Sequence, residues 1–223
     1  MPSLSLVPSL PAKSFEELEQ LLMTLTGVSK EFQVDIVDGQ IVPHTSWPFT
    51  ESDPQQALTR LASYTASFAL EIDCMVREPL QYLDTITQLG AKRVIVHLGS
   101  TNDYAAVIAH AQSHRYQLGF AANANVPLSE LEAWLPEIDF VQLMGIENVG
   151  QQGQPFDERT SERARQLRTH YPDLDLAVDG AVNAVTIPKL CAAGVNRFAP
   201  GSAIAKANDP IAAYQTLAAL IGL

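Results

Sequence analysis

The amino-acid sequence predicts an α/β fold, a single (β/α)8 TIM barrel that spans residues 1–223 as one domain. Short apolar runs alternate with helix-like segments eight times, which gives about 28 residues per unit. No segment has the composition of a linker, a low-complexity tract or a second domain. The alternative is an open doubly wound sheet, but Pro8-Ser9-Leu10-Pro11 stands where that fold has its GxGxxG turn.

The predicted strands are short apolar runs bounded by polar or turn-forming residues. The second of them is typical, because it ends at the turn pair Asp38-Gly39. The predicted strands cover residues 4–7, 32–37, 68–76, 93–98, 118–122, 140–144, 174–178 and 196–199. The loop over 38–51 is longer than a typical βα connection, and we expect it to form a wall of a site.

The predicted helices begin and end at residues that favour helix termini. Ser14 and Glu17 form a capping box, and Ser52-Asp53-Pro54 places a cap residue before a first-turn proline. Gly90 and Gly194 follow two helices and favour their ends. The predicted helices cover 14–25, a segment that begins at residue 54, 79–89, 103–113, 127–135, 157–170, 184–193 and 210–223.

Composition excludes several classes of protein. The chain is 47% hydrophobic, enough for a large core, and its net charge of −11 argues against binding to nucleic acid or an anionic membrane surface. Cys74 and Cys191 lack the spacing of a disulfide framework or a zinc finger. No run reaches transmembrane length and the N-terminus lacks the pattern of a signal peptide, so we expect a cytoplasmic protein.

Polar residues at the predicted strand ends form the candidate site, because the carboxyl ends of barrel strands meet at one mouth. Asp35 lies within an apolar strand and Asp179 ends another, each close to a glycine turn. Taken alone, Asp35 could instead pair with a basic residue or face water from an edge strand. The strand-end set is Ser9, Gln33, Asp35, Asp38, Asp73, His97, Asn123, Glu147, Asp179 and Ser202.

Three of these residues are aspartates whose convergence would create strong repulsion. If Asp35, Asp73 and Asp179 share one cavity, a proton or a cation must offset their charge. With Gln33, an all-oxygen ligand set favours Mg²⁺ or Mn²⁺ over zinc. The alternative for Asp73 is a hydrogen bond to a side chain of a neighbouring strand.

A second signal concerns phosphate. Gly201-Ser202 follows the eighth strand at a helix start, where free N–H groups bind anions, and Gly180 follows the seventh strand; a simple helix cap is the alternative. His97 fits equally a hydrogen-bonded barrel residue and a catalyst. We expect His44, His110, His114 and His170 to be solvent-exposed.

With these residues, the chain resembles the ribulose-phosphate 3-epimerase family over nearly its full length. Pro8-Ser9-Leu10 resembles the family's Pro-Ser-Ile, and residues 35–43 resemble its Asp-Val-Met-Asp-Gly-x-Phe-Val-Pro. Met75-Val76-Arg77-Glu78-Pro79 is similar to its Met-Val-x-x-Pro. The remaining matches are Val96-His97-Leu98, Val178-Asp179-Gly180 and Gly201-Ser202-Ala203-Ile204.

This resemblance implies a ribulose-phosphate-binding barrel and a metal-assisted sugar-phosphate isomerase, a pentulose-phosphate 3-epimerase. Asp35 and Asp179 would be the catalytic acid/base pair that moves a proton through an enediolate. The implied substrate-binding residues are Ser9, Met75, Gly180, Gly201 and Ser202. The implied ligands of a divalent ion (Mn, Mg, Zn or Fe) are Gln33, Asp35, Asp73 and Asp179. The implied partner is a phosphorylated sugar, and a homo-oligomer stays open.

The chain also departs from the family's pattern. Gln33 and Asp73 stand where the family has metal-binding histidines, and Ala181 replaces a glycine. Residues 147–153 replace the family's Asn-Pro-Gly-Phe-Gly-Gly loop and add Glu147, and Pro200 replaces an alanine. The alternative function is therefore a divergent barrel that binds a phosphorylated small molecule without epimerase activity or with different chemistry.

Overall fold

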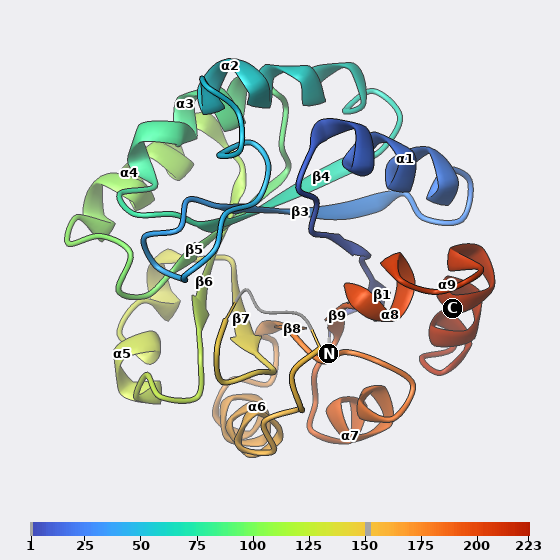
Figure 1. Cartoon of the computed structure of the whole chain (residues 1–223). Coiled ribbons are helices and arrows are strands. Elements are labelled where there is room, and N and C mark those ends of the chain that lie inside the picture. Colours follow the sequence, from blue (N-terminus) through green and yellow to red (C-terminus); the bar gives the residue numbers. More distant parts are fainter. Residues whose placement is uncertain (1, 150–152) are drawn as a thin grey trace.

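The computed structural model describes residues 2–149 and 153–223, and its centre is one parallel sheet. Its strands form a ring with the helices outside (Figure 1). The sheet order is β1-β9-β8-β7-β6-β5-β4-β3-β2. The strands are β1 (Ser5–Leu6), β2 (Ser9–Leu10), β3 (Glu31–Val37), β4 (Ala69–Met75), β5 (Arg93–His97), β6 (Gln117–Ala122), β7 (Phe140–Met144), β8 (Asp175–Asp179) and β9 (Arg197–Ala199).

Helices separate most successive strands, as the sequence predicts. They are α1 (Phe15–Leu25), α2 (Pro54–Leu58), α3 (Leu80–Gln88), α4 (Tyr104–His114), α5 (Leu128–Glu132), α6 (Arg159–His170), α7 (Thr186–Ala192), α8 (Ser202–Ala205) and α9 (Pro210–Ala219), with 3-10 turns η1 (Thr59–Ser63) and η2 (Leu135–Glu137). Ser14 and Asp53 cap α1 and α2 as expected. Within the described residues, no helix combines the length and hydropathy needed to cross a membrane.

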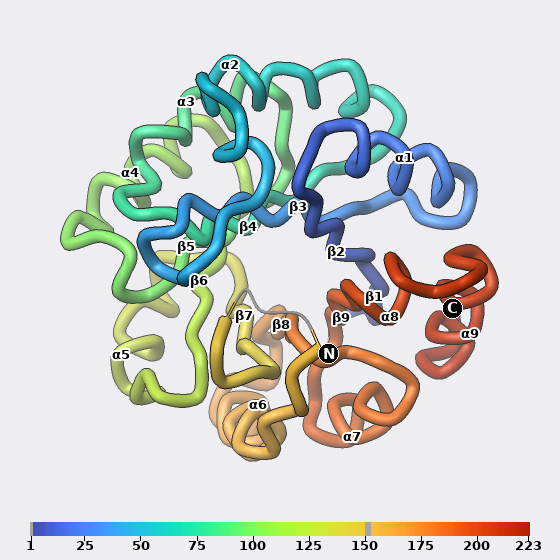
Figure 2. The backbone as a smooth tube through the Cα atoms, in the orientation of Figure 1, coloured from blue at the N-terminus to red at the C-terminus, as the bar shows by residue number. Residues whose placement is uncertain are grey.

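The first predicted strand differs from the observed one. The sequence predicts one strand over 4–7, whereas the described residues contain two short strands, β1 and β2, and nine strands in all. Strand β1 pairs with β9 and β2 pairs with β3, both in parallel (Figure 2). Pro8 lies between them and has no N–H to donate, but its carbonyl oxygen accepts a hydrogen bond from Gln33 N at 2.9 Å.

Alternation along each strand sends one set of side chains outward and the other inward. Outward residues such as Ile36, Ile72 and Val94 join the apolar faces of the helices in the larger core. Inward residues form a smaller apolar cluster that includes Ile95 and Phe140. This inner cluster separates the two ends of the strands, which are both polar.

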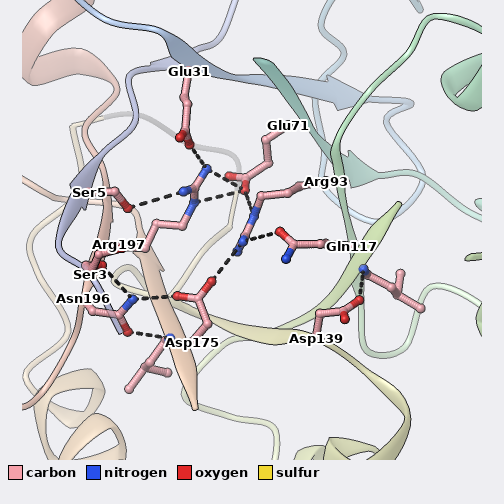
Figure 3. Close-up of polar contacts among 12 residues, drawn as sticks. Ser3, Ser5, Glu31, Glu71, Arg93, Gln117, Asp139, Asp175, Asn196 and Arg197 are labelled. Atoms are coloured by element: carbon pink, nitrogen blue, oxygen red, sulfur yellow. Dashed lines mark hydrogen bonds and ion pairs between the residues drawn. The ribbon is translucent and has the colours of Figure 1, made fainter. Parts of the chain in front are cut away.

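The amino ends of the strands carry a buried ionic network (Figure 3). Arg93 Nε donates to Glu71 Oε2 at 2.7 Å, and Arg197 Nε donates to the same oxygen at 3.1 Å. Arg93 also pairs with Asp175 at 2.9 Å, and Arg197 with Glu31 at 2.8 Å. Because both guanidinium groups are largely buried, pairing with several carboxylates offsets the cost of their desolvation. These ion pairs are structural, and the catalytic candidates lie at the carboxyl ends of the strands.

Candidate functional site

A cavity of about 810 Å³ opens at the carboxyl ends of the strands. This volume lies within the range of small-molecule sites, roughly 300 to 1,000 Å³. The predicted site residues that line it are Ser9, Asp35, Met75, Asp179, Gly180, Gly201 and Ser202. The long loop also lines it through His44, Thr45 and Ser46, so the expected wall is present.

Asp35 lies on β3 with both carboxylate oxygens occupied. Its Oδ2 accepts a hydrogen bond from Ser9 Oγ at 2.8 Å, and its Oδ1 accepts one from Gln33 Nε2 at 2.9 Å. Ser46 Oγ donates to the Asp35 carbonyl oxygen at 2.8 Å, which fastens the long loop against the strand. Residues of β2, β3 and the long loop therefore hold Asp35 in place.

Asp73 lies on β4, paired in register with Asp35, and is fully buried beneath the cavity. His97 Nε2, at the end of β5, lies 2.7 Å from Asp73 Oδ1, and Gln142 Nε2 of β7 donates to Oδ2 at 2.8 Å. The hydrogen-bond alternative considered for Asp73 is thus present, together with its approach to the other aspartates. His97 contacts the site through Asp73.

Asp179 is the last residue of β8, and its Oδ1 accepts a hydrogen bond from Gly180 N at 2.8 Å. Glycine is needed beside it, because a Cβ on Gly145 would lie 2.1 Å from the Gly180 carbonyl oxygen. The following Ala181 has φ of 54°, the left-handed region in which glycine replaces alanine without strain. The sequence departure at this position is therefore a strained one.

The three aspartates converge as predicted. Oxygens of Asp35, Asp73 and Asp179, one from each, all lie within 4.8 Å of one another. Burial, and then the charge of Asp73, raises the pKa of Asp35 from 3.8 to about 7. Burial, followed by the charges of Asp35 and Asp73, raises the pKa of Asp179 well above its usual range. Such a set holds a proton or a cation near neutral pH.

The residues present fit a hard divalent ion. Among the described residues, no lysine or arginine forms an ion pair with the three aspartates. Gln33 Oε1 is buried without a hydrogen-bond partner in the described part of the chain, and a cation would give it one. Carboxylate and amide oxygens together match Mg²⁺ or Mn²⁺ better than zinc.

The predicted phosphate residues Gly180, Gly201 and Ser202 line the same cavity. Gly180 has φ of 95°, and Gly201 is the N-cap of the short helix α8, which begins at Ser202. The backbone N–H groups of Gly201 and Ser202 at the start of α8 can face an anion in the cavity, whereas the N–H of Gly180 donates to Asp179. Residues 150–152, part of the 147–153 loop considered from the sequence, lie outside the described residues.

Several cavity or site residues escaped prediction. Lys13 and Lys206 line the cavity and bring positive charge to an otherwise acidic mouth. Gln142 could have been found, because alternation in the strand that begins at Phe140 places it on the inner face. The expected exposure is wrong for two histidines. His44 lines the cavity and its Nδ1 is buried without a partner among the described residues, and the side chain of His110 is only 11% exposed.

Comparisons with known proteins agree with this geometry. Residues 5–205 match the model of the ribulose-phosphate 3 epimerase family. The chain is 27% identical over 209 residues to the ribulose-phosphate 3-epimerase of Schizosaccharomyces pombe, covering 92% of this chain and 88% of the relative. It is 28% identical over 211 residues to the cytoplasmic isoform of ribulose-phosphate 3-epimerase from Oryza sativa subsp. japonica, and the match covers 92% of this chain and 89% of that relative.

Solved structures of lower identity share the fold. The KGPDC of Streptococcus mutans, solved in complex with a phosphorylated sugar, has a TM-score of 0.76 at 12% identity and covers 97% of this chain and 96% of its own. The 3-keto-L-gulonate-6-phosphate decarboxylase of Vibrio cholerae has a TM-score of 0.77 at 15% identity, covering 99% and 98%. At this identity the likeness concerns the fold alone, whereas the family match extends over most of the sequence. The chain belongs to the ribulose-phosphate 3 epimerase family.

Proposed function

We propose that the chain is a sugar-phosphate epimerase that inverts the carbon beside a ketose carbonyl, with a pentulose phosphate as substrate. The observation that carries the proposal is the pair Asp35 and Asp179. Both line the cavity, they come from non-adjacent strands, and the pKa of each is raised by burial and by neighbouring charge. Two such carboxylates can exchange protons with carbon near neutral pH.

One aspartate acts as base on one face of the substrate carbon, and the other acts as acid on the opposite face. In the metal-free protein, a pKa of about 7 leaves Asp35 divided between its protonated and charged forms near neutral pH. Ser9 and Gln33 hold the Asp35 carboxylate in place through its two oxygens. His97 and Gln142 do the same for Asp73.

A divalent ion is part of the proposal, held by Asp35, Asp73 and Asp179 with Gln33 as a fourth ligand. When bound, such an ion would supply positive charge to stabilise an enediolate. The oxygen ligands favour Mg²⁺ or Mn²⁺, and Zn²⁺ and Fe²⁺ are the less favoured occupants. We assign the phosphate to Gly180, Gly201 and Ser202, and the contact with the sugar carbons to Met75.

We interpret β1 and β2 as one interrupted strand, because Val7 N bonds Phe198 O at 2.8 Å and Ser9 N bonds Pro200 O at 3.1 Å. Counted in this way, the fold is a (β/α)8 barrel in one domain over residues 1–223. A cytoplasmic location, supported by the name of the rice relative, and a homo-oligomeric state stay predictions.

The experiment follows solvent deuterium into C3 of D-ribulose 5-phosphate by NMR, with metal-stripped protein and then with added Mn²⁺ or Mg²⁺. Asp35→Asn and Asp179→Asn should each lower exchange and epimerisation by about 10²- to 10⁴-fold. Glu51→Gln, on the exposed part of the long loop, is the matched control. Unchanged turnover in either aspartate variant would refute the acid/base assignment.

The same experiment distinguishes the proposed epimerase from the alternative function. Gln33 and Asp73, which replace the family's histidines, favour a barrel that binds the phosphorylated sugar without epimerising it. In that case the wild-type protein binds the substrate, but no deuterium enters C3 with either Mn²⁺ or Mg²⁺ present. Activity that appears only after Gln33→His with Asp73→His would support this alternative.

A further inference from the structure

A second group of metal-ligating side chains lies outside the catalytic cavity, on helices α3 and α4. These helices are neighbours on the outside of the ring (Figures 1 and 2). Asp84 comes from α3, and His110 and His114 come from α4, four residues apart and so on one helix face. None of the three is among the residues that line the cavity.

The three side chains lie close to one another. His110 Nε2 lies 3.0 Å from Asp84 Oδ1, and the two imidazole rings stack with their centroids 4.0 Å apart and 17° between their planes. One ligand atom of each residue lies within 4.8 Å of the others. Ligands of a tetrahedral zinc ion are about 3.3 Å apart, so the ligand atoms must approach one another by up to about 1.5 Å, and the stacked rings must also rotate until both lone pairs point at the ion.

The side chains that must move are free to do so. The Asp84 side chain is 78% exposed, and His114 is also exposed. His110, with a side chain only 11% exposed, is the fixed member around which the others can adjust. The required closure therefore needs rotation of surface side chains and no change in the packing of α3 against α4.

A hydrogen bond on the far side of the ring favours the ligand form of His114, and His110 can adopt that form once its Nε2 exchanges the contact with Asp84 for an ion. His114 Nδ1 lies 2.9 Å from the His110 carbonyl oxygen, which can only accept, so Nδ1 carries the proton and Nε2 keeps its lone pair. His110 Nδ1 lies 3.1 Å from the Tyr116 hydroxyl. When Nδ1–H donates to that oxygen, His110 Nε2 also becomes a ligand. Metal-binding histidines commonly have such partners.

We propose that Asp84, His110 and His114 bind one Zn²⁺ ion that links α3 to α4, with the fourth coordination position open to water. Two imidazole nitrogens and one carboxylate are a typical zinc ligand set, whereas the all-oxygen site in the cavity favours Mg²⁺ or Mn²⁺. The two sites therefore differ in the ion that they select. The proposal does not depend on the epimerase function.

The test is calorimetric titration of Zn²⁺ into metal-stripped protein in excess Mg²⁺, which occupies carboxylate sites and competes poorly for imidazole. We expect one Zn²⁺ per chain. His114→Ala and Asp84→Asn should each weaken its affinity at least tenfold, and Tyr116→Phe about tenfold through loss of the outer hydrogen bond. The control is His170→Ala, an exposed histidine at the end of α6.

A second measurement reads the ligands directly. Zn²⁺ should shift the imidazole ¹⁵N resonances of His110 and His114 and leave those of His170 unchanged. His114→Ala and Asp84→Asn should both keep the wild-type melting temperature without zinc and the wild-type epimerase rate with Mg²⁺. Wild-type zinc affinity in His114→Ala and Asp84→Asn, or no imidazole shift, would refute the site without affecting the proposed epimerase.

Discussion

The buried aspartates predict how the stability of the metal-free protein depends on pH. The pKa of Asp35 is raised from 3.8 to about 7 by burial and then by the charge of Asp73. The folded state therefore keeps a proton that the unfolded chain releases, so the free energy of unfolding falls as pH rises from about 4 to 7. Linkage for this one group gives a loss of about 2.5 kcal/mol between pH 5 and pH 7.5.

Asp35→Asn should remove the part of this dependence that comes from Asp35, with little change in shape. If the new amide nitrogen takes the Oδ2 position, the Ser9 hydroxyl can rotate to accept from it while Gln33 keeps donating to the oxygen; if it takes the Oδ1 position, Gln33 can instead flip to present its unpartnered Oε1. Without metal, the variant should therefore gain stability relative to the wild-type protein as the pH rises. Between pH 5 and pH 7.5, the difference in their free energies of unfolding should shift in favour of the variant by about 2.5 kcal/mol.

The assay is urea unfolding at the two pH values in the presence of a chelator, with Glu51→Gln as the control. Removing one charge also relieves Asp179, so the pH dependence of the variant should be less than half that of the wild-type protein. Addition of Mn²⁺ or Mg²⁺ should stabilise the wild-type protein at pH 7.5 more than the variant. An equal pH dependence in the two proteins would show that Asp35 is not the group that titrates.

Three further predictions concern the backbone and the ionic network. Ala181→Gly should raise the free energy of unfolding by about 1 kcal/mol, measured by urea unfolding, because it relieves a left-handed alanine; a loss of stability would contradict that interpretation. Gly145→Ala should raise KM for the phosphorylated substrate and cost about 1–3 kcal/mol, because its Cβ would force Gly180 to move; an unchanged KM would separate Gly180 from substrate binding. Arg93→Met should cost about 3 kcal/mol in urea unfolding, since Glu71 would lose its shortest ion pair, and a neutral result would mean that Arg197 alone satisfies Glu71.

Much of the fold follows from local sequence patterns. The apolar runs at residues 93–98, 118–122 and 140–144 agree closely with β5, β6 and β7, because buried parallel strands are continuous apolar segments. The first strand was predicted less well. Its pairing with both ends of the sheet depends on residues far away in the sequence, and the pattern of residues 4–7 contains no information on those contacts.

Part of the candidate site could likewise be predicted from the sequence, and part could not. Convergence of Asp35, Asp73 and Asp179 follows from their places at strand ends. The partners of Asp73 do not, because the contact with Gln142 joins side chains 69 residues apart across the barrel interior. Lys13 and Lys206 were missed for the same reason, since they lie on connecting segments whose direction relative to the cavity is set by tertiary packing.

Because of the hydrogen bonds of Asp73, the geometry of the site depends on correct strand pairing. Its carboxylate contacts His97 on β5 and Gln142 on β7, so it joins three strands at one point. A slip of β4 by one residue would turn Asp73 to the helix side of the sheet and bring Cys74 or Ile72 inward. Metal uptake during refolding should therefore report the moment at which the native register of these strands is established.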